Sequence, residues 1–269
     1  MRNIVSIQST VLNDKVGNHA ARSILSDKGY NIYEIPTVIL TSHKAVKGTL
    51  QINNNSLNPW VIFNKVRKTY KLSSNDLTII GYTPNSKISK SISKIINKQN
   101  RIVLDPVMVA KGGAKLIDGK AIQTLKKKLL KNVLLITPNI PEAEILAETS
   151  IKNKEDMIFA ANKLIDLGAK NVLLKGGHLK SKKVIDLYLS KSDFKVFTSF
   201  RHRTKNTHGT GCTLSSAIAT FLSCGKSIKS ACALGIKYVN SAILTNPNYG
   251  KGHGPINHVN SMKTKQKFN

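Results

Sequence analysis

The 269-residue sequence has few cysteines, few aromatic side chains and no long apolar run. Its three cysteines, Cys212, Cys224 and Cys232, form no CxxC pair, which argues against a disulfide framework or a cysteine zinc site. No apolar stretch approaches the length of a membrane span. The first residues lack the apolar core and cleavage site of a signal peptide. We therefore expect a cytoplasmic location and no membrane partner.

Acidic residues are also scarce. Only 14 Asp and Glu stand against 42 Lys and Arg, which gives a formal net charge of +28. Such a charge is compatible with nucleic-acid binding, with a positive field that attracts anionic substrates, or with compositional drift in an AT-rich genome. The basic residues are scattered, and no basic helix carries interleaved aromatics. We favour drift, with some benefit for binding phosphates, and expect no nucleic-acid partner.

The chain alternates between runs rich in Val, Ile and Leu and amphipathic helical patterns. This alternation predicts an α/β fold with a mostly parallel central sheet and helices on both faces. No long linker or internal repeat is present, so we expect a single domain over 1–269. Strands are expected at 3–9, 31–40, 77–82, 101–109 (its end a loop), 132–139 and 171–177, and helices at 16–29, 60–70, 89–99, 121–130, 141–148, 156–168, 213–223 and 227–244.

Two further segments interrupt this alternation. The polar stretch 42–59 is typical of a loop or flap, and the runs VIDLYLS and FKVFTSFR predict an antiparallel hairpin. Polar or glycine-rich segments follow nearly every expected strand: QST, GYTPN, DPVMVAKGG, TPNIPE, LKGGH and NTHGTGC. Ligands of open α/β sheets lie beyond the carboxyl ends of the strands. The pattern therefore favours an enzyme with an anionic substrate.

The segment HGTGCT stands before a helix that we expect to start near Cys212. Gly209 and Gly211 permit unusual backbone angles and a close approach of a ligand. The free N–H groups and positive dipole end of the helix complete an anion hole. The alternative is a tight turn in which Thr213 caps the helix. No GK[ST] follows, so the segment is not a P-loop.

The segment TKNTHGTGCTLSSAIA resembles the C-terminal signature of the ribokinase-like vitamin kinases, above all the hydroxymethylpyrimidine and phosphomethylpyrimidine kinases. DPVMVAKGG, TPNIPEAEIL, LLKGGH and GKGHGPINH resemble further motifs of that group in the same order, and the likeness covers essentially the whole chain. In the N-terminal third, SIQSTVLNDKVGNHAA, PTVILTSH and IIGY resemble pyridoxal kinases instead.

The resemblance implies a ribokinase-like kinase that uses ATP and Mg²⁺ and phosphorylates a hydroxymethyl group on a small heterocycle. The first choice of acceptor is hydroxymethylpyrimidine or its monophosphate, in thiamine biosynthesis. The alternative is pyridoxal, pyridoxine or pyridoxamine. Members of the group often form homodimers, so a homodimer is possible.

Cys212 occupies the position at which many ribokinase-like enzymes carry an Asp that acts as a base. A helix N-terminus can lower a thiol pKa, so Cys212 either takes the proton or orients the acceptor hydroxyl, with Gly209 and Gly211 beside it. The alternative is a small buried residue that opens a helix. Cys224 and Cys232 are expected on the apolar faces of helices, as core residues.

Asn139 and Glu142 match the N-x-x-E element that helps to hold Mg²⁺ and its waters in this group. The alternative is a helix N-cap with an acid in the first turn. The resemblance places Asp105 near the metal and phosphates, although an Asp before Pro can simply start a turn.

The resemblance implies that Lys175 contacts the ATP phosphates; the alternative is a solvated strand end. Lys111 adds charge from a loop. We expect Thr204, Lys205 and Thr210 to line the nucleotide site.

The likeness to pyridoxal kinases places Ser9, Thr37 and His43 against the heterocycle, with Tyr82 stacked on it. The alternatives are an ordinary strand residue for Thr37 and a core residue for Tyr82. For His253 and His258 we expect no metal site, because no carboxylate or cysteine cluster is near them in the sequence.

Overall fold

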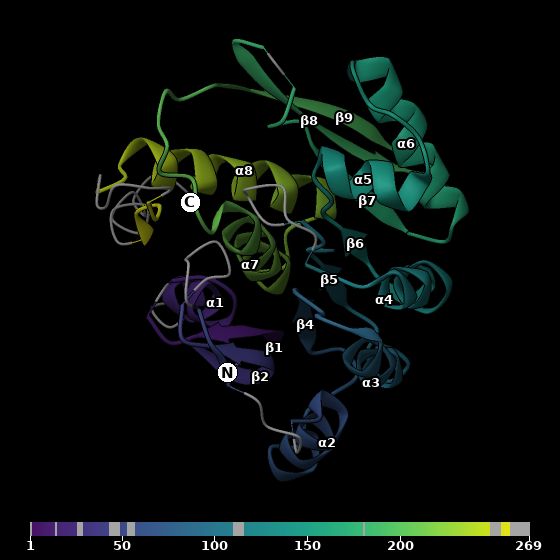
Figure 1. Ribbon diagram of the computed structural model, residues 1–269, viewed down its shortest axis with the longest axis vertical. Coiled ribbons are helices and arrows are strands. Elements are labelled where there is room, and N and C mark those ends of the chain that lie inside the picture. Colours follow the sequence, from purple (N-terminus) through teal and green to yellow (C-terminus); the bar gives the residue numbers. More distant parts are fainter. Residues whose placement is uncertain are drawn as a thin grey trace.

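The computed structural model describes residues 2–13, 15–25, 29–42, 49–52, 57–109, 116–179, 181–247 and 254–258. Within these segments one sheet has nine strands in the order β3-β2-β1-β4-β5-β6-β7-β8-β9 (Figure 1). The strands β2, β1, β4, β5, β6 and β7 are parallel, and β3, β8 and β9 are antiparallel additions at the two edges. Their bounds are β1 Arg2–Val11, β2 Tyr30–Leu40, β3 Gln51–Ile52, β4 Leu77–Ile80, β5 Ile102–Leu104, β6 Leu135–Ile136, β7 Asn171–Lys175, β8 Lys183–Ser190 and β9 Phe194–Phe200.

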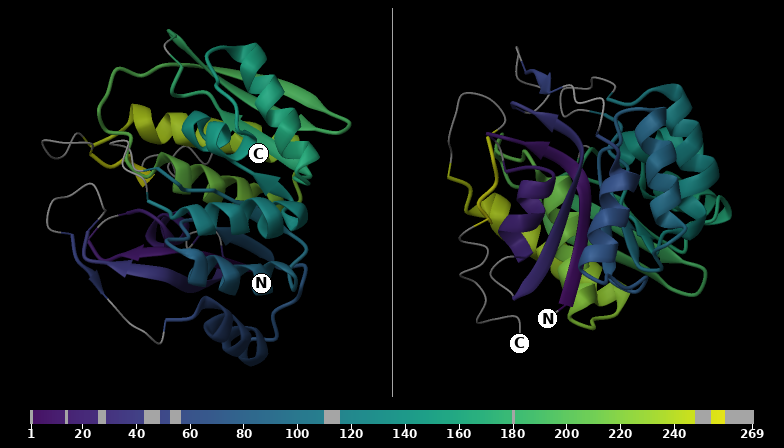
Figure 2. Two further views of the ribbon diagram at one scale, coloured as in Figure 1. Left: turned by 45° about the vertical axis from the view of Figure 1, so that its right-hand side comes forward. Right: turned by 90° about the horizontal axis from the view of Figure 1, so that it is seen from below.

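Helices cover both faces of this sheet (Figure 2). α2 to α6 pack on one face, and α1, α7 and α8 pack on the other. The predicted mostly parallel α/β architecture is therefore confirmed. The helical bounds are α1 Asn18–Leu25, α2 Pro59–Thr69, α3 Ser86–Ile96, α4 Gly119–Thr124, the π-helix η2 Leu125–Leu129, the 3-10 helix η3 Leu130–Asn132, α5 Ile140–Ala147, α6 Lys154–Asp166, α7 Thr210–Ser223 and α8 Ile228–Leu244.

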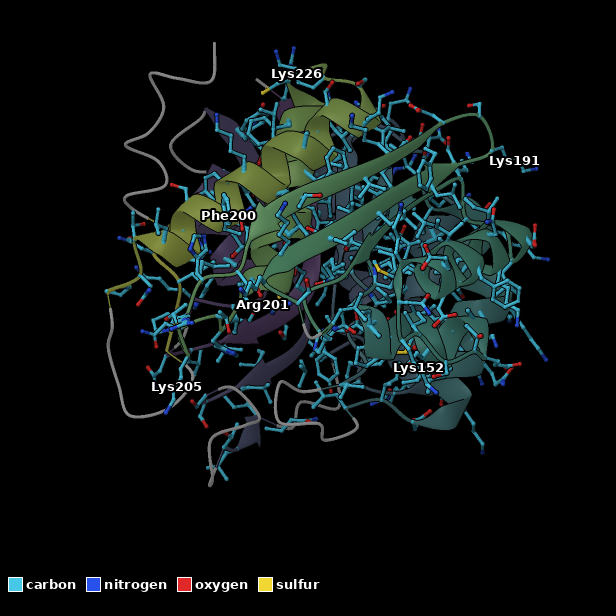
Figure 3. All side chains as sticks on the ribbon, turned by 90° about the horizontal axis from the view of Figure 1, so that it is seen from above. Lys152, Lys191, Phe200, Arg201, Lys205 and Lys226 are labelled. Carbon is cyan, nitrogen blue, oxygen red and sulfur yellow. The ribbon has the colours of Figure 1, made fainter. Side chains whose placement is uncertain are left out.

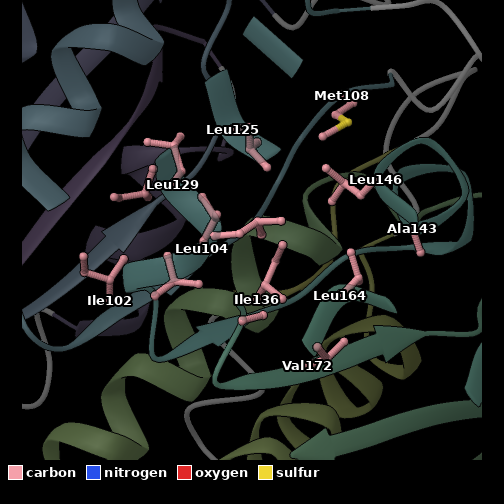
Figure 4. Packing of buried hydrophobic residues seen from close by; sticks show 14 of the residues in the cluster. Ile102, Leu104, Met108, Leu125, Leu129, Ile136, Ala143, Leu146, Leu164 and Val172 are labelled. Carbon is pink, nitrogen blue, oxygen red and sulfur yellow. The ribbon is translucent and has the colours of Figure 1, made fainter. Parts of the chain in front are cut away.

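Successive side chains of the central strands enter opposite cores. In β5, Ile102 and Leu104 pack with α3 to α6, whereas Val103 packs with α7 and α8. This follows from the two-residue period of a strand. A parallel strand is buried on both faces, which explains the continuous aliphatic runs of the sequence. Figure 4 shows Leu104 and Ile136 among the helical residues of the core that β5 shares with α3 to α6.

Several predicted boundaries and roles were wrong. α7 begins at Thr210 rather than at 213, because Gly209 is its N-cap; Thr213 is fully buried inside the helix and does not cap it. The predicted helix 121–130 is divided into α4 and the π-helix η2. The stretch 42–59 contributes the short strand β3, paired with β2, among its described residues. Each of these differences depends on which backbone groups hydrogen-bond to one another, and residue patterns do not specify this.

The predicted hairpin is confirmed, with β8 and β9 paired from Lys183–Phe200 to Leu189–Phe194. Cys232 is fully buried, as expected. Cys224, predicted as a core residue, is exposed, because it stands at the C-cap just after α7. Its Sγ lies 3.0 Å from the Tyr30 hydroxyl. Among the described segments, no helix is long and apolar enough to span a membrane.

Candidate functional site

The carboxyl ends of β5 and β7 bring Asp105 and Lys175 together. Lys175 Nζ lies 3.0 Å from Asp105 Oδ1, and the Thr137 hydroxyl donates to the same oxygen at 3.4 Å. The Asp105 side chain is 2% exposed and that of Lys175 16%. A buried ion pair of this kind needs both partners, since either charge alone would carry its full desolvation penalty.

The glycine turn lies directly against this pair. A Cβ at Gly211 would stand 3.1 Å from Asp105 Oδ2 and 3.6 Å from Lys175 Nζ. Gly209 has φ +81°, which a residue with a side chain rarely adopts. The first turn of α7 therefore presents its N–H groups next to a lysine and a carboxylate, at the carboxyl edge of the sheet.

A segment near the C-terminus hydrogen-bonds to the residues that directly precede the glycine turn. His208 N donates to Gly254 O at 3.1 Å, and Gly254 N donates to Asn206 Oδ1 at 3.0 Å. The Asn206 amide donates in turn to Asn246 Oδ1 at 2.6 Å, after the end of α8. The predicted motifs NTHGTGC and GKGHGPINH thus meet in space. This contact gives the second motif a local structural role.

Cys212 lies in the first turn of α7, where a lowered pKa was expected. The opposite holds. Burial and then the nearby charge of Asp105 raise the pKa of the Cys212 thiol to about 12, and the Gly17 N–H and Lys175 offset this only in part. The local loss of water thus outweighs the helix terminus. The thiol is neutral at pH 7.

Asn139 and Glu142 form a capping box at the start of α5. Asn139 Oδ1 accepts from the Glu142 N–H at 3.0 Å, and Glu142 Oε2 accepts from the Asn139 N–H at 2.8 Å. The predicted cap is therefore present, and the metal role stays a prediction beside it. Lys175 N donates to Pro138 O at 2.8 Å, which ties this helix start to β7.

Two acids and one lysine share this buried region. Burial and then Asp105 raise the pKa of Glu142 to about 7, against the effect of Lys175 and two backbone N–H groups. Burial alone would lower the pKa of Lys175, but Asp105 and Glu142 outweigh it and raise the pKa. The raised pKa of Glu142 thus comes chiefly from the burial of its carboxyl group, and Lys175 offsets it only in part.

The described residues contain no group of three or more His, Cys, Asp and Glu side chains that could hold a metal ion. The pair Asp105 and Glu142 nevertheless fits Mg²⁺, which usually takes one or two carboxylates and keeps several waters. The donor set is therefore of the right kind.

The predicted nucleotide residues flank the glycine turn. Lys205 is exposed. The Thr204 hydroxyl accepts from the Asn206 N–H at 3.1 Å, and the Thr210 hydroxyl donates to Thr207 O at 3.1 Å. Their contact with a nucleotide stays a prediction. His43, Lys111 and His253 lie outside the described residues, whereas His258 is buried at 2% exposure.

Thr37 and Tyr82, two of the residues predicted to contact the acceptor, both donate hydrogen bonds to backbone oxygens of the protein. The Thr37 hydroxyl donates to Tyr82 O at 2.6 Å, and the Tyr82 hydroxyl donates to Leu116 O at 2.7 Å. Tyr82 is 6% exposed and packs in a small apolar cluster with Val11, Val16, Val38 and Leu40. Stacking of Tyr82 on a heterocycle stays a prediction.

Ser9 stands at an irregularity of β1. The register with β2 shifts between Gln8 and Thr10, which takes Ser9 out of the ladder. Such irregularities often occur beside active sites. Ser9 lies against Gly17, where a Cβ would stand 2.7 Å from its Oγ, and the Gly17 N–H in turn faces Cys212. Ser9 therefore borders the glycine turn, and its contact with an acceptor stays a prediction.

The sequence patterns missed two polar residues near the site. Asp186 on β8 is 8% exposed and accepts from the Gly176 N–H at 3.0 Å. Burial raises its pKa to about 6. Asn18 is fully buried at the start of α1 and accepts from the Ser6 hydroxyl at 2.8 Å. A lone acid within the apolar strand VIDLYLS was a visible signal for Asp186.

The fold and the site define an α/β protein with a glycine turn at the start of a helix, set against a buried lysine–carboxylate pair. The chain belongs to the phosphomethylpyrimidine kinase family, whose model matches residues 36–257. The thiamine biosynthesis bifunctional protein ThiED of Geobacter sulfurreducens is 49% identical over 162 residues, 60% of this chain. The match spans about a third of that relative's length, 33%.

A second relative, the hydroxymethylpyrimidine/phosphomethylpyrimidine kinase of Bacillus subtilis, is 37% identical over 70% of this chain and 72% of its own. The solved structure of the pyridoxal kinase from Staphylococcus aureus in complex with AMP-PCP and pyridoxal has a TM-score of 0.83. It is 26% identical and covers 96% of this chain and 93% of that one. The predicted ribokinase-like fold and both parts of the predicted resemblance are thereby confirmed.

Proposed function

We propose that this chain transfers the γ-phosphoryl group of ATP to the hydroxymethyl group of hydroxymethylpyrimidine, of its monophosphate, or of both. The observation that carries the proposal is the position of Gly211 against the Asp105–Lys175 pair. The first turn of α7 and the Lys175 ammonium group thus lie side by side. Transfer of a phosphoryl group depends mainly on such positioning and charge stabilisation.

Each residue has a defined task in this proposal. Lys175 and the first N–H groups of α7 bind phosphate oxygens. Asp105 and Glu142 would hold Mg²⁺, and the bound ion would supply positive charge to the phosphates. The neutral Cys212 thiol orients the acceptor hydroxyl, because a thiol with a pKa of about 12 is rarely ionised and is therefore a poor base at pH 7.

The pyrimidine acceptor is supported by the names of both curated relatives, which concern thiamine biosynthesis and the pyrimidine kinases. Pyridoxal is the second candidate. It is favoured by the likeness to the Staphylococcus aureus pyridoxal kinase, which was solved with pyridoxal bound, and by the sequence of the N-terminal third. The two acceptors differ in ring chemistry and share the hydroxymethyl group that receives the phosphoryl group.

The test is a phosphorylation assay with Mg-ATP, run in parallel on hydroxymethylpyrimidine, its monophosphate and pyridoxal, with products identified by mass. Turnover on either pyrimidine and little on pyridoxal is the expected result. Turnover mainly on pyridoxal would reverse the choice of acceptor. The folded K175M variant is the control for contaminating kinases. No turnover on any of the three compounds would refute the kinase assignment.

A homodimer and a cytoplasmic location complete the proposal. The homodimer is supported by the resemblance alone, and the location by the sparse cysteines. Light scattering of the purified chain at micromolar concentration tests the first, and fractionation of the source cells tests the second.

A further inference from the structure

The glycine pair after β7 forms a tight turn that needs support from elsewhere. Leu179 N donates to Gly176 O at 3.0 Å, which closes a four-residue turn immediately after Lys175. Two adjacent glycines have many accessible conformations. The position of this turn, which directly follows Lys175, therefore depends on contacts that fix it from outside.

Asp186 supplies one such contact from β8. It stands opposite Lys175 in the antiparallel register of β7 and β8, and its Oδ1 accepts from the Gly176 N–H at 3.0 Å. The turn also lies directly against β8, since a Cβ at Gly176 would lie 1.9 Å from Ile185 O. A carboxylate acceptor makes the stronger, charge-assisted kind of hydrogen bond.

Arg201 supplies the other contacts, from the residue directly after β9 (Figure 3). Its guanidinium donates to three backbone oxygens of the segment after β7: Gly177 O at 2.8 Å, Leu179 O at 2.7 Å and Ser181 O at 2.8 Å. One planar side chain thus gathers three carbonyls of a short segment. Lysine has no planar fork and cannot reproduce this geometry.

We propose that Asp186 and Arg201 are positioning residues that hold the turn 176–179, and through it Lys175, in the place required for the phosphates of a nucleoside triphosphate. The identity of that ligand rests on the proposed kinase function. The hairpin β8–β9 then has a role beyond extending the sheet: it holds the turn by an acceptor on one strand and a donor after the other. Lys175 is fixed at its side-chain end by Asp105 and at its backbone N–H by Pro138 O, and the residue that follows it is fixed by this hairpin.

The test uses the full chain and the variants R201Q, R201K, D186A and D186N. The matched control is K195Q, which removes a charge from the exposed part of β9 opposite Tyr188, away from the turn. R201Q and D186A are expected to raise the Kd for ADP and the KM for ATP about tenfold, which equals about 1.4 kcal/mol. The KM for the acceptor should change less than twofold. D186N should restore most of the nucleotide affinity, because it keeps an acceptor oxygen, and R201K should restore little.

Hydrogen exchange gives a second readout that does not depend on turnover. The amides of Gly176 and Leu179 should exchange at least tenfold faster in D186A and R201Q, and not in K195Q. Unchanged exchange and unchanged ADP affinity would overturn the proposal, and so would equal rises in both KM values. If the unaltered chain neither binds ADP nor turns over, the kinase function fails, and the exchange rates alone decide whether the hairpin holds the turn.

Discussion

A methyl group at Gly211 is the smallest change that would test the proposed site. In G211A the new Cβ would stand 3.1 Å from Asp105 Oδ2, tighter than nine in ten such contacts, so the carboxylate must retreat by a few tenths of an ångström. Asp105 is 2% exposed and paired with Lys175 at 3.0 Å. The displacement therefore passes directly to the lysine that is proposed to bind phosphate.

The stability and activity of G211A should respond differently. Overpacking costs about 1–3 kcal/mol, but alanine is favoured over glycine in a helix by about 1 kcal/mol, so the two effects partly cancel in stability. In activity they do not cancel, since a misplacement of about 1 Å can cost about 100-fold. We expect kcat/KM to fall at least tenfold while Tm falls by a few degrees at most.

Steady-state kinetics with Mg-ATP and a thermal melt measure these two quantities. The matched control is G119A at the first residue of α4, where a Cβ would meet nothing within 4 Å; its kcat/KM should stay at the wild-type value. If G211A is folded and as active as the wild type, the close approach of this turn to the Asp105–Lys175 pair has no catalytic meaning.

Three further variants test the charges of the site. The folded pKa of Asp186 is raised from 3.8 to about 6, so the native state binds the proton more tightly than the unfolded chain and loses stability as pH rises between these values. In urea melts, the stability advantage of D186N over the wild type should therefore grow by on the order of 2–3 kcal/mol from pH 4 to pH 7. A difference in stability that does not change with pH would contradict this expectation. C212S should retain turnover within about tenfold, since positioning by a hydroxyl needs no ionised thiol; an alkaline limb in the wild-type kcat profile that vanishes in C212S would instead identify the thiolate as the base. K175M should lower the free energy of unfolding by about 3–5 kcal/mol through the unpaired Asp105, and the double variant with D105N should recover much of this loss; additive losses in the double-mutant cycle would show that the pair is not coupled.

The sequence patterns predicted the sheet because its determinants are local. Each parallel strand is a short aliphatic run between amphipathic helices, and the polar residues that follow these runs meet at one edge of the sheet. The motifs that contain Asp105 and Lys175, 70 positions apart, could therefore be assigned to one edge of the sheet, whereas the role of each residue came from the family resemblance. The predictions of kinase type and acceptor depended instead on the family resemblance, as the glycine turn alone does not specify them.

The remainder depends on contacts between distant segments. The three carbonyls held by Arg201 and the bond from Gly176 to Asp186 follow from the register of β7, β8 and β9, which no residue pattern fixes. The pKa of Cys212 was predicted in the wrong direction, because the desolvation of its thiol and the nearness of Asp105 arise only when distant segments fold together. The expectation of a single domain stays a prediction.

The bonding of Thr37 and Tyr82 bears on the choice of acceptor. A hydroxyl has one proton, and these two hydroxyls donate to Tyr82 O and Leu116 O, so neither can donate to a bound ring at the same time. In the segments PTVILTSH and IIGY, which resemble pyridoxal kinases, these two hydroxyl protons are therefore already used in hydrogen bonds within the protein. A T37V variant should consequently lose about 1–3 kcal/mol of stability while its kcat/KM ratio between hydroxymethylpyrimidine and pyridoxal stays within twofold of the wild type. A tenfold shift in that ratio, measured at equal folded fraction, would show that Thr37 recognises the acceptor and would strengthen the case for pyridoxal.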